Sequence, residues 1–473
     1  MSVQSSVPVE KATPASTANA EKWQGRIISL LAISYLLLQI YPGQEMEAVV
    51  SVIILGVIVW VMPRIRGSTL TISTVLLLLA VGLMVYYEAS VQEWLQAARV
   101  NLTLIALFLF VPLLGIPVRT GGYVEALKIV LARSMNEPRF FYIGSKLLTH
   151  MLGVVLNIGA VSIVYQLTKA SNITSSRLIA NALNRGFVTS IYWSPYFSAM
   201  ALILSQLHIT WSSIVLYSLG LVFISTVVSI GLDHSVIRSN EQEQKHREGI
   251  RETTDPIHLQ KAKRKVIELF ILLTLIMGLV LFVERMTSYS MVLIICLVSL
   301  IFPLLWCGFS GKAAPLIEQL QQHLDVGIPR MKKEIVLFLI AGFFSGAIVQ
   351  AELSGYLIEA MNAVFGSFTM GIAFFFSLLI VLTAVVGLHP IVVVTILATS
   401  IDPRLIGLSP EYFAVLLLAS WGISNTVSPA TAVNNLLSHL LKENVLDVSI
   451  RWNLKYALIM LMFIPFYLWA LNI

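Results

Sequence analysis

Nine runs of mostly apolar residues recur along the chain, and short polar segments separate them. A helix needs about 20 mostly apolar residues to cross a lipid bilayer, and each run approaches that length. Uninterrupted apolar runs of this kind are typical of membrane-spanning helices rather than of a soluble core. The predicted spans are 26–42, 46–62, 69–87, 100–118, 211–232, 266–284, 290–308, 334–351 and 453–472.

Two longer apolar regions, 141–206 and 368–441, are interrupted by polar residues, Pro and Gly. Irregular backbone at membrane depth is tolerated only where it is buried in protein or lines a watery cavity. A functional site is therefore expected in these two regions. We interpret the first part of each region as a re-entrant hairpin and the second part as a broken helix, namely hairpins 146–168 and 368–400 and broken helices 178–206 and 410–441.

The composition agrees with a membrane protein. Of 473 residues, 57% are hydrophobic and 12% are charged, whereas a soluble domain carries about 25% charged residues. This excludes a disordered chain, and the two cysteines, Cys296 and Cys307, lie in apolar runs where a reduced, buried thiol is expected. The sequence predicts an all-α polytopic membrane protein with about 11 transmembrane helices in addition to the two hairpins and the interrupted helices.

The amino-terminal segment differs from the rest. Residues 1–25 are polar and rich in Ser, Thr, Ala and Pro. The apolar run after them has no small-residue cleavage pattern behind it and leads straight into another span, unlike a signal peptide. We expect 1–25 to be a disordered cytoplasmic tail and 26–42 to be an additional transmembrane helix.

The two interrupted regions share a weak internal repeat, which is worth seeking early in any chain. Three residues of the first region recur in the second at a constant offset of 234, so that Ser190, Ser194 and Pro195 correspond to Ser424, Ser428 and Pro429. Between these positions, Asn157 falls opposite His389. We interpret 46–232 and 266–473 as two repeats of one unit.

Basic residues decide the predicted topology, since cytoplasmic loops carry an excess of Lys and Arg. The polar stretch 233–265 holds eight basic residues, and more lie in 119–146. Both segments fall on the cytoplasmic side if the hairpins re-enter without crossing. We therefore expect 233–265 to be a solvated cytoplasmic linker, with the N-terminus cytoplasmic and the C-terminus outside the cell membrane. The two halves then have opposite orientation, and inverted repeats with interrupted helices are typical of secondary transporters.

The helix breaks carry the candidate binding residues. Pro removes a backbone donor and clashes with the preceding turn, so each helix should unwind before its proline. The half-helix that follows then presents its positive dipole end, which favours an anion, while freed carbonyls can coordinate Na⁺. The alternative is that the Ser-Pro pairs only kink buried helices. The candidates are Ser190, Ser194 and Pro195 at the first break and Ser424, Asn425, Thr426, Ser428 and Pro429 at the second.

The hairpin tips add three further candidates, Asn157, His389 and Pro390. Gly and Pro suit a tight reversal, and a polar residue at the tip would point toward the protein centre. His389 can titrate near neutral pH and donate a hydrogen bond to an anion. The alternative is a neutral histidine bonded to a backbone carbonyl.

Several chemistries have no candidates in the sequence. We find no Asp or Glu in the middle of a predicted span and no Lys or Arg at the membrane midplane, so dipoles and hydroxyls are expected to hold the substrate. No P-loop, GxSxG, HExxH or Cys cluster occurs, which excludes an ATP-driven pump and the familiar hydrolases. We expect no catalytic residues, no metal site and no cofactor apart from Na⁺ as a coupling ion. Nucleic acid is not expected as a partner, because the basic residues flank apolar spans.

The chain resembles the ion-transporter superfamily, which contains dicarboxylate/sodium symporters, citrate and arsenite carriers and the large subunits of TRAP transporters. The resemblance rests on Ser424-Asn425-Thr426, the two Ser-Pro breaks and the polar tips. It implies that Ser424, Asn425 and Thr426 contribute to substrate and sodium binding. It also implies an elevator-like motion of hairpins and broken helices against a scaffold, and a homodimer as the expected assembly.

The sequence thus predicts a secondary active transporter of a small carboxylate or oxyanion, coupled to Na⁺ or H⁺ and working in the lipid bilayer. Two alternatives stay open. One is a membrane-embedded transferase acting on lipid or polysaccharide, which would gather charged side chains at one membrane face. The other is a channel or an assembly factor without transport activity.

Overall fold

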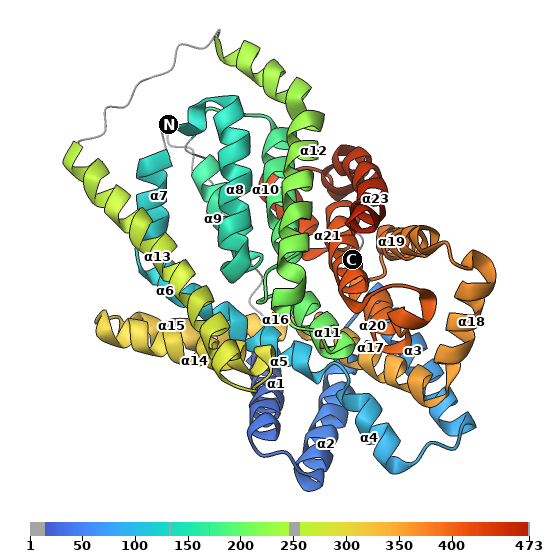
Figure 1. Ribbon diagram of the computed structural model, residues 1–473. Helices are drawn as coiled ribbons and strands as arrows, with labels where there is room; N and C mark the ends of the chain where they lie inside the picture. The colour runs from blue at the N-terminus through green and yellow to red at the C-terminus, as the bar shows by residue number, and fades with distance from the viewer. Residues whose placement is uncertain (1–14, 132–133, 170, 246–255, 472–473) are drawn as a thin grey trace.

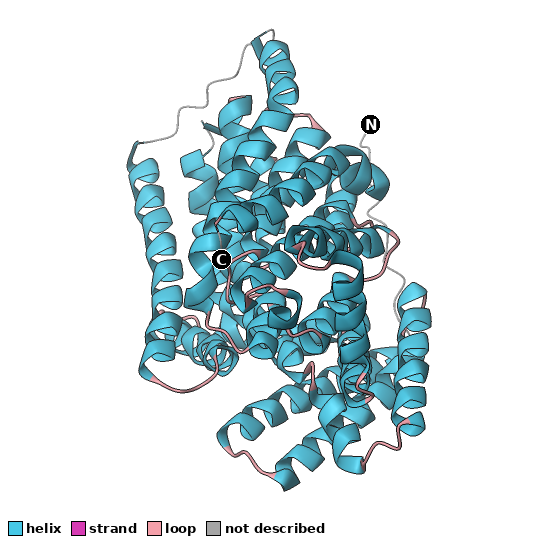
Figure 2. Ribbon diagram, turned by 45° about the vertical axis from the view of Figure 1, so that its right-hand side comes forward, coloured by secondary structure: helices cyan, strands magenta, loops and turns pink. Residues whose placement is uncertain are grey.

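The computed structural model describes residues 15–131, 134–169, 171–245 and 256–471. Every regular element in these ranges is a helix, and short loops join the helices (Figure 2). Ten helical segments of the described chain are long and apolar enough to cross a membrane. An eleventh is reached if α18 (Leu353–Phe365) and α19 (Thr369–Val385), which are bent by 119° to each other, count as one span. The protein is therefore an all-α, multi-pass membrane protein, which confirms the fold class.

Seven helices precede the first interrupted region. Three of them, α4 to α6, form one bent span, Val91–Thr120, in which a 3-10 turn at Val111–Leu114 contains Pro112. The bend follows from the amide donor that proline lacks. The seven helices are α1 (Ala15–Ile40), α2 (Gln44–Val61), α3 (Ser68–Tyr86), α4 (Val91–Arg99), α5 (Leu102–Phe110), α6 (Gly115–Thr120) and α7 (Tyr123–Leu131).

Helix α1 differs from the expectation of a disordered tail over 1–25. It begins at Ala15, while residues 1–14 lie outside the described chain. Tertiary packing explains the early start, because a Cβ at Gly25 would lie 2.2 Å from the carbonyl oxygen of Leu324. Gln24 beside it is buried, and Lys22 forms an ion pair with Asp325 at 3.6 Å. Leu324 and Asp325, about 300 residues later in the chain, thus hold the first part of α1 in place. This part of the helix is polar and has no apolar periodicity that would predict it.

The two interrupted regions each contain four helices. The region with the predicted hairpin 146–168 reverses at Asn157, and its second helix pair is separated at 192–197. The region with the predicted hairpin 368–400 reverses at 386–389, and its second pair is separated at 428–431. The helices are α8 (Pro138–Leu156), α9 (Gly159–Thr168), α10 (Ser176–Ile191) and α11 (Ser198–Leu207), then α19, α20 (Pro390–Ser400), α21 (Pro410–Val427) and α22 (Ala432–Leu441).

The expected linker 233–265 is helical wherever the structure describes it. Residues 233–245 continue α12, residues 256–265 open α13, and 246–255 lie outside the described chain. Asp233, expected in solvent, is 1% exposed, so the solvated part of this stretch begins later than predicted. The remaining helices are α12 (Trp211–Lys245), α13 (Pro256–Met286), α14 (Met291–Phe309), α15 (Ala313–Gln322), α16 (Ile328–Arg330), α17 (Lys332–Gln350) and α23 (Trp452–Ala470).

The helices of the interrupted regions interlock. Helix α10 packs on α8, and α21 packs on α19 (Figure 1). The two broken helices also pack on each other, and α11 lies against α20 of the second hairpin. At the crossing of the broken helices, a Cβ at Gly422 would lie 2.3 Å from the ring of Tyr192. Only glycine allows this approach, which brings α21 directly against the start of the first break.

Candidate functional site

At the first break, the predicted residues bind the protein itself. The hydroxyl of Ser190 donates to the carbonyl of Phe187 in its own helix at 2.6 Å. The hydroxyl of Ser194 donates to the carbonyl of Val154 on α8 at 2.7 Å, and Pro195 next to it is buried. Ser194 therefore ties the break to the first hairpin, whereas Ser190 only satisfies a helix carbonyl.

At the second break too, the predicted side chains form hydrogen bonds with the protein itself, with one exception. The hydroxyls of Ser424 and Thr426 are buried and donate to carbonyls three residues back, both at 2.6 Å. Ser428 is buried and accepts from the amide of Ala430 at 3.3 Å, next to half-buried Pro429. Asn425 is the exception, since it is half-buried and only its amide nitrogen is bonded, to the carbonyl of Trp421 at 2.9 Å. Among the described residues, its Oδ1 has no hydrogen-bond donor.

Asn434 on α22 holds the second break in shape. Its amide nitrogen lies 2.9 Å from the carbonyl oxygen of Asn425 and 2.8 Å from that of Ser428, so it satisfies acceptors that the unwound backbone has freed. Its Oδ1 accepts from the amide of Asn184 on α10 at 2.6 Å. This bond links the two broken helices. Sequence reasoning missed both asparagines, although each is a polar residue inside an apolar region.

Both helices that follow a break begin without a side-chain cap. Phe197 precedes α11 and Thr431 precedes α22, and neither side chain accepts from a first-turn amide. Many other helices of the described chain also lack such a cap, as α2 and α17 do, whereas α14 is capped by Ser290 and α21 by Ser409. The first amides of a helix need an external partner. At these two helices, that partner can be an anion.

The hairpin tips are built differently from each other. Asn157 has a φ of 52°, in the left-handed region that Asn tolerates, and its Oδ1 accepts from the amide of Ile158 at 2.7 Å. His389 caps α20, since its Nδ1 accepts from the amide of Ile391 at 3.2 Å, and Pro390 occupies the first helical position. A neutral ring that accepts at Nδ1 carries its proton on Nε2. The bond is thus to a backbone amide and not to a carbonyl, and no hydrogen bond within the described residues involves Nε2.

The structure brings part of the predicted set together. The ring of His389 lies 6.2 Å from that of Trp421, one turn before Asn425, and 5.3 Å from Phe338. The second hairpin tip therefore contacts the helix that leads into the second break. Asn157 makes only its local bond within the described chain. Near the first break, the buried hydroxyls of Tyr192 and Tyr196 have no hydrogen-bond partner among the described residues.

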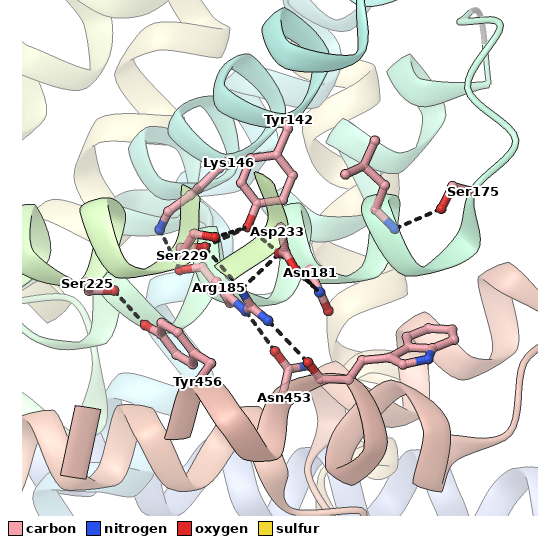
Figure 3. A network of polar contacts seen from close by, with 12 residues as sticks. Tyr142, Lys146, Ser175, Asn181, Arg185, Ser225, Ser229, Asp233, Asn453 and Tyr456 are labelled. Atoms are coloured by element: carbon pink, nitrogen blue, oxygen red, sulfur yellow. Dashed lines mark hydrogen bonds and ion pairs between the residues drawn. The ribbon is translucent and has the colours of Figure 1, made fainter. Parts of the chain in front are cut away.

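A buried charge cluster lies beside the first break, where sequence reasoning placed no charge (Figure 3). Arg185 on α10 and Asp233 on α12 form an ion pair at 2.9 Å, and each side chain is 1% exposed. Asp233 also accepts from the hydroxyl of Tyr142 at 2.7 Å and from the amide of Asn181 at 3.0 Å. The expectation that Asp233 belongs to a solvated linker is therefore wrong, because this ion pair and these hydrogen bonds bury it.

The guanidinium of Arg185 reaches a third element as well. It donates to Oδ1 of Asn453 on α23 at 2.8 Å and to the carbonyl of Trp452 at 3.2 Å. It also lies 4.6 Å from the ring centre of Tyr456, a cation–π contact. The cost of burying two charges is offset only where geometry and hydrogen bonds are good, and these contacts meet that condition. The cluster thus fastens α10, α12 and α23 together.

Lys146 adds a second buried basic side chain to this region. It lies on α8, is 1% exposed and donates to the carbonyl of Arg185 at 3.4 Å. Because it ends the basic segment 119–146, it was expected to mark the cytoplasmic surface. The packing of α8 on α10 is too close for that, since a Cβ at Gly186 would lie 2.5 Å from the carbonyl oxygen of Lys146.

His150, one turn after Lys146, contacts the first break. The indole Nε1 of Trp193 donates to Nε2 of His150 at 3.2 Å, and Nδ1 lies 3.0 Å from the hydroxyl of Thr189. Because an indole can only donate, Nε2 must accept and Nδ1 must carry the proton of a neutral ring. His150 therefore acts as a hydrogen-bonded link between hairpin and break.

An open polar pocket of about 430 Å³ lies away from the breaks, where the amino end of α10 meets α12. Its lining includes Ser175 and Arg177 on one side and Ser239 and Asn240 on the other. Within the described ranges, no group of three or more His, Cys, Asp and Glu side chains is placed to hold a metal ion.

No protein-family model and no curated protein sequence matches this chain. Among solved structures, the chain is similar to the YdaH transporter of Alcanivorax borkumensis, a structure described as having an unusual topology. The sequence identity is 17%, the match covers 76% of this chain and 84% of that chain, and the TM-score is 0.47.

Proposed function

We propose that the protein is a secondary active transporter that moves a small carboxylate or oxyanion across the cell membrane. The observation that carries this proposal is the pair of broken helices, which cross each other and are followed by half-helices with uncapped amino ends. Such ends bind anions through backbone amides and the helix dipole. Asn425 Oδ1, the Nε2–H of His389 and the hydroxyls of Tyr192 and Tyr196 supply further polar groups nearby.

The burial of the second break favours a protein-lined site over a lipid-facing kink. Within Pro410–Leu441, 83% of the residues in its most apolar stretch are buried in the protein. The same share is 22% in the span Ser68–Tyr86. Irregular backbone needs such surroundings, or water, to satisfy its amides and carbonyls. A kinked helix facing lipid would leave these groups unpaired.

The proposal includes an inverted repeat, with halves 46–232 and 266–473, and an elevator-like motion within a homodimer. Equivalent helix pairs support the repeat, since α8 packs on α10 as α19 packs on α21, and α12 packs on α8 as α23 packs on α19. Cross-contacts support a common moving unit. Helix α11 lies against α20, and the hydroxyl of Tyr165 on α9 donates to the carbonyl of Leu440 on α22.

The charge cluster bears on the transferase alternative, which requires charged side chains open to a substrate at one membrane face. Arg185, Asp233 and Lys146 are each 1% exposed, and the first two are saturated by neighbouring groups. A sealed cluster of this kind offers no entry to a lipid or polysaccharide. Transport by the breaks therefore agrees better with the geometry.

A thermal-shift screen of carboxylates and oxyanions, each with and without Na⁺, tests the function. A substrate present at 100 times its dissociation constant stabilises the folded protein by about 2.7 kcal/mol. Compounds that raise the melting temperature are then tested for uptake into proteoliposomes under an imposed Na⁺ or H⁺ gradient. Absence of gradient-driven uptake for every stabilising compound would contradict the proposal.

Replacing Asn425 with alanine is expected to abolish the ligand-induced rise in melting temperature while the ligand-free protein still folds. The side chain supplies the free acceptor at the second break, and losing such a contact costs about 1–3 kcal/mol, equivalent to roughly a 5- to 150-fold weaker affinity. Asn435→Ala is the matched control. Asn435 bonds the carbonyls of Pro429 and Thr431 at the same break, but its side chain is exposed and both bonds come from its amide nitrogen, so its variant should keep the ligand response. Normal uptake by Asn425→Ala would refute its role.

The proposed topology places Lys245 in the cytoplasm and Ile473 outside. In a variant without Cys296 and Cys307, a cysteine introduced at position 473 is expected to react with a membrane-impermeant maleimide added to intact cells. A cysteine at position 245 is expected to react only after the membrane is permeabilised. Labelling of position 245 in intact cells would show that the hairpins cross the membrane instead of re-entering it.

A further inference from the structure

The side chain of Lys146 is buried and has no ion-pair partner among the described residues. Arg185 already takes the salt bridge with Asp233, whose carboxylate also accepts from Tyr142 and Asn181. In the part of the chain that the structure describes, the Nζ of Lys146 makes one hydrogen bond, to the carbonyl of Arg185 at 3.4 Å. Arg185 and Asp233 balance each other, so a charged Lys146 would leave the cluster with one uncompensated positive charge. Burying such a charge is far more costly than burying a neutral amine.

The groups that face Lys146 do not remove this imbalance. Helix α10 contributes Arg185, and α12 contributes Asp233, which is already paired. On α8 itself, the neighbours one turn away are Tyr142 and the neutral His150. On α9, which packs on α8, the titratable side chain is Tyr165, and its hydroxyl is bonded to the carbonyl of Leu440. The remaining positive charge can be lost only if Lys146 gives up a proton.

A continuous series of hydrogen bonds connects Lys146 with the first break. The carbonyl of Arg185 accepts from Lys146 at 3.4 Å and from the hydroxyl of Thr189 at 3.0 Å. The same hydroxyl meets Nδ1 of His150 at 3.0 Å, and Nε2 of His150 accepts from Trp193 at 3.2 Å. The residues are four apart, at 146 and 150 on α8 and at 185 and 189 on α10, with 193 following in the break, so they form two facing rows.

We propose that Lys146 is a proton-binding site of the transporter, and that these hydrogen bonds couple its charge to the position of the first break. On release, the ammonium becomes an amine, the proton passes to water, and the amine keeps a hydrogen for the Arg185 carbonyl. On binding, the new charge beside Arg185 repels it and weakens the contact of α8 with α10. The inference rests on the proposed transport function and identifies H⁺ as a coupling ion.

The test uses the full-length protein in nanodiscs and needs no substrate. Melting temperature is measured from pH 5.5 to 9 for the wild type and for Lys146→Met, Lys146→Gln and Lys455→Met. An amine that is neutral in the fold but charged after unfolding makes the unfolding constant fall tenfold per pH unit, since stability rises with pH where the unfolded state binds more protons. Both Lys146 variants are expected to lose this dependence. Lys455, exposed on α23, is the matched control and should retain it.

Hydrogen exchange of the backbone amides at 192–197 provides the second measurement. After correction for intrinsic exchange, protection of this segment is expected to change several-fold between pH 6 and pH 8.5 in the wild type, but not in Lys146→Gln. A pH dependence of stability that is identical in wild type and variants would overturn the proton site. If Lys146 binds a proton but the protection of residues 192–197 does not change with pH, the coupling is overturned. Neither result affects the substrate-induced thermal shift, so that measurement tests the transport proposal independently.

Discussion

Replacing Arg185 with methionine is expected to destabilise the folded protein by about 3–5 kcal/mol, because it leaves the buried carboxylate of Asp233 without its counter-ion. The loss should appear as a large fall in melting temperature and in the yield of folded protein. The effect extends over three helices, since the guanidinium also holds Asn453 and the carbonyl of Trp452 on α23. Stability is measured by thermal unfolding in detergent.

Two further variants isolate the ion pair. The double replacement Arg185→Met with Asp233→Asn removes both charges and is expected to recover much of the lost stability, since a neutral pair has no charge to desolvate. Arg451→Met breaks an exposed pair with Asp447, at 3.1 Å, and should cost about 0–1 kcal/mol. If Arg185→Met melts like Arg451→Met, the cluster does not stabilise this fold.

Replacing Gly186 with alanine is expected to separate α8 from α10. The new Cβ would lie 2.5 Å from the carbonyl oxygen of Lys146 and 3.0 Å from Cβ of Thr149, and neither the backbone nor the first side-chain atom of a helix can easily move. Overpacking of this kind costs about 1–3 kcal/mol. Melting temperature and crosslinking between cysteines on the two helices both measure the change.

Gly144 provides the matched control for that substitution. It lies on α8 two residues before Lys146, and a Cβ there meets nothing within 4 Å. Gly144→Ala is therefore expected to be neutral or to stabilise the helix slightly, since alanine favours helix over glycine by about 1 kcal/mol. Equal melting temperatures for the two alanine variants would contradict the close approach at Gly186.

Local sequence signals predicted much of the helical pattern. Proline lies at both breaks, and glycine lies at both tips, so the interruptions around 195, 429 and 389 could be read without a structure. The start of α1 could not, because its first turns depend on packing against 323–330, which is remote in sequence. Its polar residues carry no apolar periodicity that would indicate a helix.

The candidate site was predictable in position but not in detail. Ser190, Ser424 and Thr426 lie at the breaks, yet their hydroxyls bond the preceding helix carbonyls, as short hydroxyl side chains do within helices. Arg185 and Asp233 were missed because the partners are 48 residues apart and Asp233 begins a highly charged stretch. The available signal was the polar series Asn181, Asn184 and Arg185, which lies on one face of a helix in an apolar region.

The histidines of the two hairpins each lie against a tryptophan on a broken helix. Ring centres are 6.0 Å apart for His150 and Trp193 and 6.2 Å apart for His389 and Trp421. Indole fluorescence is quenched by a nearby imidazole, and more strongly once that imidazole is protonated. The chain holds nine tryptophans, so the emission that is lost when Trp193 or Trp421 is changed to phenylalanine reports on the hairpin beside that tryptophan. Opening of the two hairpins can therefore be timed separately in unlabelled protein.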